Sequence, residues 1–247
     1  MTEPKVEVGQ IPNHQGETLA VLLSRGNTSG LLRVRRANLE RLSEIRHIVF
    51  VGSSGSGKTT VVDEVRSLVE KNPSLALLFE VPKRVVTRPE RKGDNLIENR
   101  FVATPEEFAG LTQGGLTWVR KLEGDRTERY GFVPKENEAH IGIYSANNAI
   151  LTNKETVRAP DADFLNHALI VMVYTPDEVR EESFLARSGG DLGAGEIAVR
   201  LGDRAISQYP EAHILMKNAV HGERPSLETV RASVNDILRG VIFSRGV

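Results

Sequence analysis

Apolar and polar residues alternate along most of this chain in two recurring patterns. Short continuous apolar runs are typical of buried strands, and apolar residues at three- and four-residue steps are typical of helices that bury one face. The apolar runs predict strands at residues 47–51, 141–144, 169–174 and 213–216. Helical patterns occupy about residues 57–69, 194–207 and 226–238. Strands alternating with helices predict an α/β fold whose parallel sheet is covered on both faces.

A β-rich stretch interrupts this alternation in the middle of the chain. Thr104 and Glu107 form a capping box with Pro105 at the first helical position, which predicts a helix from there to Gly114. Further strands are predicted at residues 74–81, 83–86, 116–122 and 128–132. A second capping box begins at Thr175 and predicts a helix that ends near Arg187. The Gly-rich connection at 188–193 follows it.

Residues 1–46 precede the first strand of the alternating pattern and are predicted to be an N-terminal extension of unknown role. Strands at 18–23 and 31–34 and a helix at 37–45 are expected within it. A locally basic stretch there fits either a docking patch for a polyanion or a solvated helix face. Its arginines are Arg33, Arg35, Arg36, Arg41 and Arg46. The main domain is expected at 47–240, followed by a C-terminal tail at 241–247.

The most specific motif is the phosphate-loop pattern G-x-x-x-x-G-K-[ST], which lies between a predicted strand and a predicted helix. Its glycines allow a tight turn whose N–H groups surround an anion, and the following helix adds the positive end of its dipole. Lys58 is expected to reach the β- and γ-phosphates of ATP, and the Thr59 hydroxyl to ligate Mg²⁺. The alternative is a turn that binds nothing. The predicted nucleotide-binding residues are Gly52, Ser53, Ser54, Gly55, Ser56, Gly57, Lys58, Thr59 and Thr60.

Composition narrows the possible partners. The 247 residues include 32 Lys and Arg against 33 Asp and Glu, and this net charge of −1 gives no argument for nucleic acid or a membrane as partner. The chain has no cysteine, which excludes disulfides and Cys-ligated metals. The longest strongly apolar run, at 168–174, is far shorter than the ~20 residues of a membrane helix. Since no signal-peptide pattern is visible, a soluble cytoplasmic protein is expected.

Several short motifs, taken in their order, resemble the guanylate kinase family. After the phosphate loop come Thr87-Arg88-Pro89, the capping box at Thr104, and Tyr130-Gly131. Within that family, the pair Glu98-Asn99 and Trp118 are more similar to the ribose 1,5-bisphosphate phosphokinase branch. The resemblance covers about residues 47–240. It implies a three-layer P-loop NTPase fold with a parallel sheet, a small β-rich insertion that binds the acceptor, and a helical lid.

The resemblance also implies a reaction and roles for four further residues. Arg88 would clamp a phosphate of the acceptor with its guanidinium fork. Tyr130 would either donate its hydroxyl to the same phosphate or pack in the core. Arg187 and Arg200 would close over the transferring phosphate as lid cations and act in catalysis together with Lys58. The γ-phosphoryl group of Mg·ATP would move to a small phosphorylated metabolite. Ribose 1,5-bisphosphate or a similar sugar phosphate is the preferred acceptor, and GMP or another nucleoside monophosphate is the second.

The predicted site departs from guanylate kinases at the strand that carries their magnesium-organising aspartates, where Ser145, Asn147 and Asn148 stand here. Asp161 and Asp163 could organise metal-bound water, or they could be solvated loop residues. Two other functions therefore stay open: a nucleotide-binding regulatory or scaffold module with a degenerate kinase site, and a P-loop NTP hydrolase. A kinase consumes ATP only with its acceptor, a hydrolase consumes it without one, and a scaffold does neither.

Overall fold

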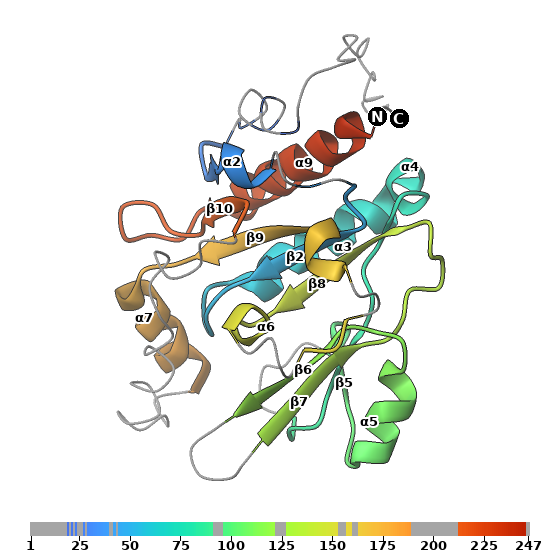
Figure 1. The fold of residues 1–247 in the computed structure, drawn as a ribbon. Coiled ribbons are helices and arrows are strands. Elements are labelled where there is room, and N and C mark those ends of the chain that lie inside the picture. The colour runs from blue at the N-terminus through green and yellow to red at the C-terminus, as the bar shows by residue number, and fades with distance from the viewer. Residues whose placement is uncertain are drawn as a thin grey trace, which may run out of the picture.

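A six-stranded sheet forms the centre of the molecule (Figure 1). The computed structural model describes residues 19, 21, 23, 27, 29–39, 42, 44–90, 96–121, 127–152, 157–159, 163–188 and 212–245. The strand order is β1-β10-β9-β2-β8-β3. The strands are β1 (Leu32–Val34), β10 (Ile214–Lys217), β9 (Ala168–Tyr174), β2 (His47–Val51), β8 (Ile141–Ala146) and β3 (Phe79–Glu80). All neighbours pair in parallel except β1, which pairs antiparallel with β10. The predicted parallel α/β sheet is thus confirmed, with one antiparallel edge strand.

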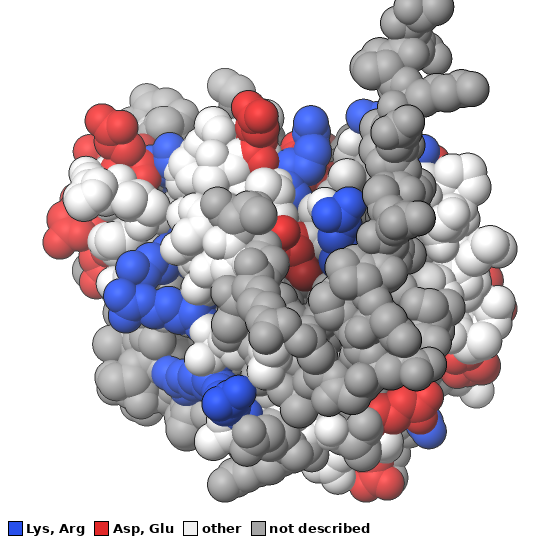
Figure 2. Space-filling view, turned by 90° about the horizontal axis from the view of Figure 1, so that it is seen from above, with Lys and Arg blue, Asp and Glu red and all other residues white. Residues whose placement is uncertain are grey.

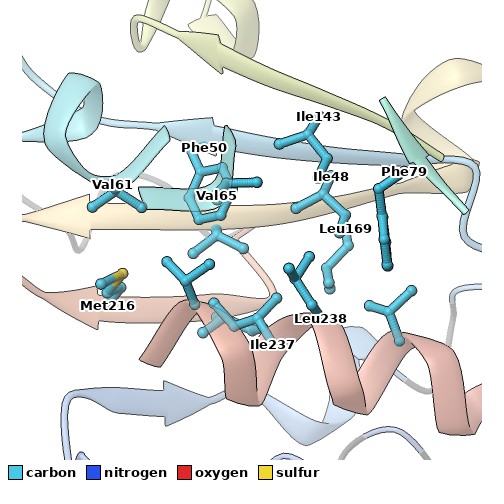
Figure 3. Close-up of a cluster of buried hydrophobic side chains, with 14 of the residues drawn as sticks. Ile48, Phe50, Val61, Val65, Phe79, Ile143, Leu169, Met216, Ile237 and Leu238 are labelled. Carbon is cyan, nitrogen blue, oxygen red and sulfur yellow. The ribbon is translucent and has the colours of Figure 1, made fainter. Parts of the chain in front are cut away.

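Two long helices cover one face of this sheet. They are α3 (Lys58–Lys71) and α9 (Leu227–Ser244), and the side chain of Ser226 caps α9 by accepting a hydrogen bond from Thr229 N at 3.2 Å. Ile237 and Leu238 of α9 point toward the strands, where Phe50 and Leu169 lie (Figure 3). This cluster excludes water from the face that carries α3, so it holds the start of α3 firmly behind the end of β2.

A second, four-stranded sheet lies against the other face of the main sheet. Its order is β5-β4-β7-β6, with β4 and β5 parallel and the other pairs antiparallel. The strands are β4 (Arg84–Val86), β5 (Asn99–Phe101), β6 (Thr117–Lys121) and β7 (Thr127–Phe132). Thr104 caps α5 (Pro105–Thr112), as its capping box predicted, by accepting a hydrogen bond from Glu107 N at 3.1 Å. The predicted β-rich insertion is therefore a small sheet with one helix of its own.

The two sheets enclose a second apolar cluster. Val49 and Val51 of β2 point into it, whereas Ile48 and Phe50 point to the opposite face, as expected for alternating strand side chains. Trp118 is the largest of the fully buried side chains in this cluster. Two short elements complete the layer, α6 (Ala149–Thr152) and the 3-10 helix Phe164–His167. One face of the sheet is thus covered mainly by β-structure rather than by helices.

One predicted strand is wrong in its first half, and another is wrong at the residues that the structure describes. The first half of residues 74–81 forms α4 (Pro73–Ala76), because Asn72 caps it by accepting a hydrogen bond from Ser74 N at 3.0 Å and Pro73 occupies its first position. Within residues 18–23, Leu19 and Leu23 are helical. Four residues apart, both leucines pack close to Gly240 of α9. A local apolar run did not distinguish helix from strand at either place.

The ends of three predicted segments also differ. The helix predicted at 37–45 is only α2 (Arg36–Leu39), after which Arg46 N donates a hydrogen bond to His167 O at 3.0 Å. The strand β1, from the predicted N-terminal extension, joins the main sheet. Helix α9 continues to Ser244 and buries Val241 completely, so it extends into the predicted C-terminal tail. Among the described residues, no helix combines the length and apolar character that crossing a membrane requires.

The face seen from above carries both positively and negatively charged side chains. Figure 2 shows Lys and Arg as well as Asp and Glu among the described residues of that face. Two arginines of the basic N-terminal stretch can be compared. Arg46 forms an ion pair with Glu44 at 3.1 Å, whereas Arg41 lies outside the described residues. Exposed pairs of this kind contribute about 0–1 kcal/mol each to stability.

Candidate active site

The phosphate loop connects the carboxyl end of β2 to the start of α3, where the sequence predicted it. Gly55 and Gly57 have φ angles of 77° and 88°, which lie in the left-handed region that favours glycine. A Cβ atom at Gly57 would lie 2.0 Å from Asn218 Nδ2, and one at Gly52 would lie 2.5 Å from the carbonyl oxygen of Val173. Larger side chains at Gly52 and Gly57 would therefore force the loop apart from β9 and from the residue that follows β10.

Side chains from three other segments hold the carbonyl groups of this loop from its outer side. Asn218 Nδ2 and Thr175 Oγ1 both donate hydrogen bonds to Ser56 O, at 2.7 and 2.9 Å. Arg180 Nε donates to Ser54 O at 3.1 Å, and Arg224 Nη2 donates to Gly55 O at 2.7 Å. These bonds to its carbonyls, together with the hydrogen bond that Ser56 N donates to Ser53 O at 3.2 Å, hold the loop in a fixed curvature.

Arg180 also links the loop to helix α7 (Asp177–Ser188). Its side chain is almost completely buried and forms an ion pair with Asp177 at 2.8 Å. The second capping box predicted this helix correctly in position, but Thr175 donates its hydroxyl hydrogen bond to the phosphate loop. In Figure 1, α7 lies on the side of the main sheet toward which β2 and β9 end. This is the edge formed by the carboxyl ends of the parallel strands, where open α/β sheets bind their ligands.

Lys58 lies over the loop that precedes it. Its Nζ donates hydrogen bonds to Gly52 O and Ser53 O, both at 2.7 Å. Thr59 and Thr60 follow at the N-terminus of α3 and are half-buried. The Ser56 hydroxyl is buried and makes no hydrogen bond within the described part of the chain. These features fit a nucleoside triphosphate with Mg²⁺ at Thr59. They are the left-handed Gly55 and Gly57, the close packing of Gly52 against Val173 O, and a helix N-terminus without a side-chain cap.

The predicted acceptor residues Arg88 and Tyr130 lie on adjoining strands of the second sheet or directly after them. Arg88 is half-buried, donates a hydrogen bond to Pro89 O at 2.9 Å, and places its guanidinium carbon 5.2 Å from the ring centroid of Phe101. Tyr130 is buried against Trp118, with ring centroids 5.5 Å apart and planes 10° apart. The Tyr130 hydroxyl donates a hydrogen bond to Glu128 Oε2. Sequence reasoning did not single out Glu128, although its position two residues before Tyr130 predicts the same strand face.

A polar connection that sequence reasoning also missed joins the second sheet to the main sheet. Arg84 Nε donates to Asn99 Oδ1 at 2.8 Å, and Arg84 Nη1 lies 3.2 Å from Glu98 Oε1. The same Nη1 donates to Ser145 O at 3.4 Å, at the end of β8. Three residues further, Asn148 Nδ2 donates to Ser53 Oγ at 3.2 Å. The pair Glu98-Asn99 and the residues that stand in place of aspartates therefore lie between the second sheet and the phosphate loop.

The remaining predicted site residues lie elsewhere or are not described. Arg187 belongs to the last turn of α7, but its side chain is outside the described residues. Arg200, the connection at 189–193 and the helix predicted at 194–207 are also outside them, as is Asp161. Asp163 precedes β9 and lies at the amino end of that strand, away from the phosphate loop. A role for Asp163 in organising metal-bound water is therefore wrong, because the metal would lie at the opposite end of the sheet.

Comparison with known proteins adds one informative relative. The chain is 27% identical over 191 residues to the ribose 1,5-bisphosphate phosphokinase PhnN of Rhodopseudomonas palustris, and the match covers 75% of this chain and 88% of that protein. This similarity supports a guanylate kinase-like P-loop kinase. The resemblance seen in the motifs is thereby confirmed. No protein-family model matches the chain.

A solved structure is also similar in part. The crystal structure of guanylate kinase from Anaplasma phagocytophilum has 17% sequence identity and a TM-score of 0.45, over 79% of this chain and 85% of that one. A TM-score of this size carries no conclusion about the site.

Proposed function

We propose that this chain is an ATP-dependent kinase that transfers the γ-phosphoryl group of Mg·ATP to a small phosphorylated acceptor. Ribose 1,5-bisphosphate or a similar sugar phosphate is the preferred acceptor, and GMP is the second. The observation that carries the proposal is the polar connection from Arg84 through the end of β8 to Ser53 of the phosphate loop. It connects the second sheet, from which Arg88 would bind the acceptor, to the loop that would hold the donor.

The residues supply what phosphoryl transfer requires, which is position and positive charge. Bound Mg·ATP would supply the phosphoryl group and a divalent charge, with Thr59 as the protein ligand of the metal. Lys58 would leave the two loop carbonyls that it now binds and contact phosphate oxygens. Arg88 would hold the phosphate of the acceptor, and Arg187 and Arg200 would add positive charge from the lid. No general base is needed where the attacking group is an ionised phosphate oxygen.

The name of the curated relative favours ribose 1,5-bisphosphate as acceptor. Two local features agree with it. Arg88 is followed directly by Pro89, and Trp118 stacks on Tyr130 in the second sheet. A degenerate scaffold and an NTP hydrolase remain the alternative functions, because Ser145, Asn147 and Asn148 leave the end of β8 without a carboxylate.

The test is ATP consumption by the full chain, measured without an acceptor and with ribose 1,5-bisphosphate, GMP or other nucleoside monophosphates. A kinase gives consumption that depends on one acceptor, and the phosphorylated acceptor is identified by mass spectrometry. Lys58→Ala should abolish this activity and leave the melting temperature of the free protein nearly unchanged, because Lys58 is only half-buried and does not belong to the apolar clusters. Acceptor-independent consumption would instead indicate a hydrolase, and ATP binding without consumption would indicate a scaffold.

A further inference from the structure

We propose that Arg224 is a positioning residue for the nucleotide, because it fastens helix α7 to the phosphate loop through Ser183. Neither side chain would touch the nucleotide in this role. The inference rests on the donor half of the proposed function, since it concerns the loop that would hold the triphosphate. It predicts that ATP affinity depends on a contact outside the loop, and that bound ATP makes α7 more rigid in return.

The first observation is that one nitrogen atom of Arg224 joins the two segments. Arg224 Nη2 donates hydrogen bonds to Gly55 O and to Ser183 Oγ, each at 2.7 Å. The Ser183 hydroxyl in turn donates to Val179 O at 2.9 Å, four residues earlier on α7. Because its single proton is used in that bond, the hydroxyl presents only lone pairs to Arg224. The bridge therefore has a fixed direction, from the arginine to both the loop and the helix.

The second observation is a parallel contact one turn earlier on the same helix. Arg180 Nε donates to Ser54 O at 3.1 Å, and Arg180 Nη1 pairs with Asp177 at 2.8 Å. Residues three apart on a helix share a face, so Arg180 and Ser183 turn the same side of α7 toward the loop. The first contact ends on the carbonyl of Ser54, and the bridge from Ser183 ends on the next carbonyl. One face of α7 is thus seated on two successive peptide groups of the loop.

The third observation explains what holds Arg224 in place. It follows a tight turn after β10, in which Val220 and Glu223 exchange backbone hydrogen bonds at 2.8 and 3.1 Å. The two residues between them, His221 and Gly222, have φ angles of 52° and 83°. Positive φ angles at both central positions are characteristic of a two-residue turn of type I′. This turn fixes the point from which the arginine side chain reaches back to the loop.

The guanidinium group also packs against the loop. An added Cβ atom at Gly57 would lie 2.9 Å from Arg224 Nη1, so this nitrogen is close to the start of α3. A loop that is already held in its binding shape loses less conformational entropy when the ligand arrives, and so binds it more tightly. Bonds to the outer carbonyls of the loop have this effect without contacting the ligand. Since linkage is reciprocal, a bridge that raises ATP affinity must itself become more stable when ATP binds.

The first experiment measures binding of Mg·ATP to the full chain by calorimetry, without an acceptor. Arg224→Ala should weaken ATP binding roughly 10-fold, and Ser183→Ala about three- to fivefold. In the Arg224→Ala background, Ser183→Ala should change the affinity by less than about twofold, because the bridge is already lost. Ser183→Thr keeps the hydroxyl and should stay within about twofold of the wild-type affinity.

Two controls match these variants. Arg231→Ala removes an arginine of α9 whose side chain is 50% exposed and pairs with Glu64 of α3 at 2.7 Å. Ser244→Ala removes a hydroxyl that donates to Val241 O at 2.8 Å, at the end of α9. Both controls should keep the wild-type ATP affinity. Melting temperatures are measured alongside, and Arg224→Ala should melt close to the wild-type protein because Arg224 is exposed.

The second experiment measures amide hydrogen exchange of α7 with and without Mg·ATP. In the wild-type protein, ATP should slow exchange in the part of α7 that contains Val179 and Ser183, because the bridge there becomes more stable. In Arg224→Ala, at ATP concentrations that fill the site, this added protection should be largely lost. A merely structural role would lower the protection equally with and without ATP, so the comparison separates the two roles.

Several results would overturn the proposal. They are no ATP binding by the wild-type protein, unchanged ATP affinity in Arg224→Ala, and exchange of α7 that ATP does not alter. Losses that simply add in the double variant would show that Arg224 contacts the nucleotide directly, which also contradicts the proposal. If Arg224→Ala does not fold, Ser183→Ala and Ser183→Thr give the same comparison.

The outcome can be separated from that of the proposed function. If the bridge affects ATP binding but no acceptor supports ATP consumption, the kinase function fails while the role of Arg224 stands. If an acceptor is found but both Arg224→Ala and Ser183→Ala bind ATP like the wild-type protein, the kinase function stands and the role of Arg224 fails.

Discussion

Acid should destabilise this protein through one buried histidine, and the size of the effect follows from its surroundings. His213 is 8% exposed and precedes β10. Its Nδ1 accepts a hydrogen bond from the backbone N–H of Ile170 at 3.0 Å. A protonated ring would be charged in a buried position and would carry a proton on the nitrogen that must accept. Burial lowers the pKa of His213 from 6.5 to about 4.

The direction of the pH dependence follows from proton binding in the two states. In the unfolded chain the histidine binds a proton as the pH falls below about 6.5, whereas in the folded protein it does not bind one until about pH 4. The contribution to stability is therefore fully present above pH 6.5 and is lost as the pH falls toward 4. A difference of 2.5 units at about 1.4 kcal/mol per unit amounts to roughly 3 kcal/mol.

The measurement is the free energy of unfolding in urea at several pH values between 7 and 4, compared between the wild-type protein and His213→Asn. Asparagine can place an amide oxygen where Nδ1 now lies, so the hydrogen bond from Ile170 is kept without a titrating group. The variant should lose about 3 kcal/mol less than wild type over this range. His221→Asn, at an exposed histidine of the turn after β10, is the matched control. Parallel curves for wild type and His213→Asn would refute the argument.

Four further substitutions test the site. Gly57→Ala should lower stability by about 1–2 kcal/mol through its left-handed φ, and should weaken ATP binding measured by calorimetry because Asn218 must move away from the loop. Unchanged ATP affinity would contradict this. Arg88→Ala should raise the KM of the acceptor by roughly 10- to 100-fold with little effect on the KM of ATP, and equal effects would exclude a clamp at Arg88. Arg200→Ala should lower kcat about 100-fold with little change in melting temperature, and values within about threefold of wild type for it and Arg187→Ala would exclude the lid role.

The parts of the fold that the sequence predicted well are those whose signal is local. The phosphate loop and the cap at Thr104 each depend on residues within a few positions of one another. The strands at the centre of the main sheet are almost entirely apolar, with His47 at the start of β2 as an exception, as expected for buried parallel strands. Residues 74–81 misled the prediction because an apolar run is compatible with both states, and the cap at Asn72 decided between them.

The acceptor side was predicted less completely because its geometry comes from strand pairing. Arg84 is an ordinary strand residue in the sequence, and only the pairing of β4 with β5 brings it to Asn99. Its contact with Ser145 spans 61 positions along the chain. Long-range pairings of this kind leave no pattern in a single sequence.

The same reasoning explains why the outer support of the phosphate loop could not be predicted, and what it implies for function. Thr175, Arg180, Asn218 and Arg224 bind carbonyl groups of a loop that precedes them by more than 100 positions. A backbone carbonyl is present at every residue, so these partners impose no requirement on the sequence of the loop. The curvature that an anion meets is therefore set jointly by the loop glycines and by the segments after β9 and β10. Since Arg180 belongs to α7, which leads toward the predicted lid, a displacement of α7 would be transmitted directly to Ser54 of the phosphate loop.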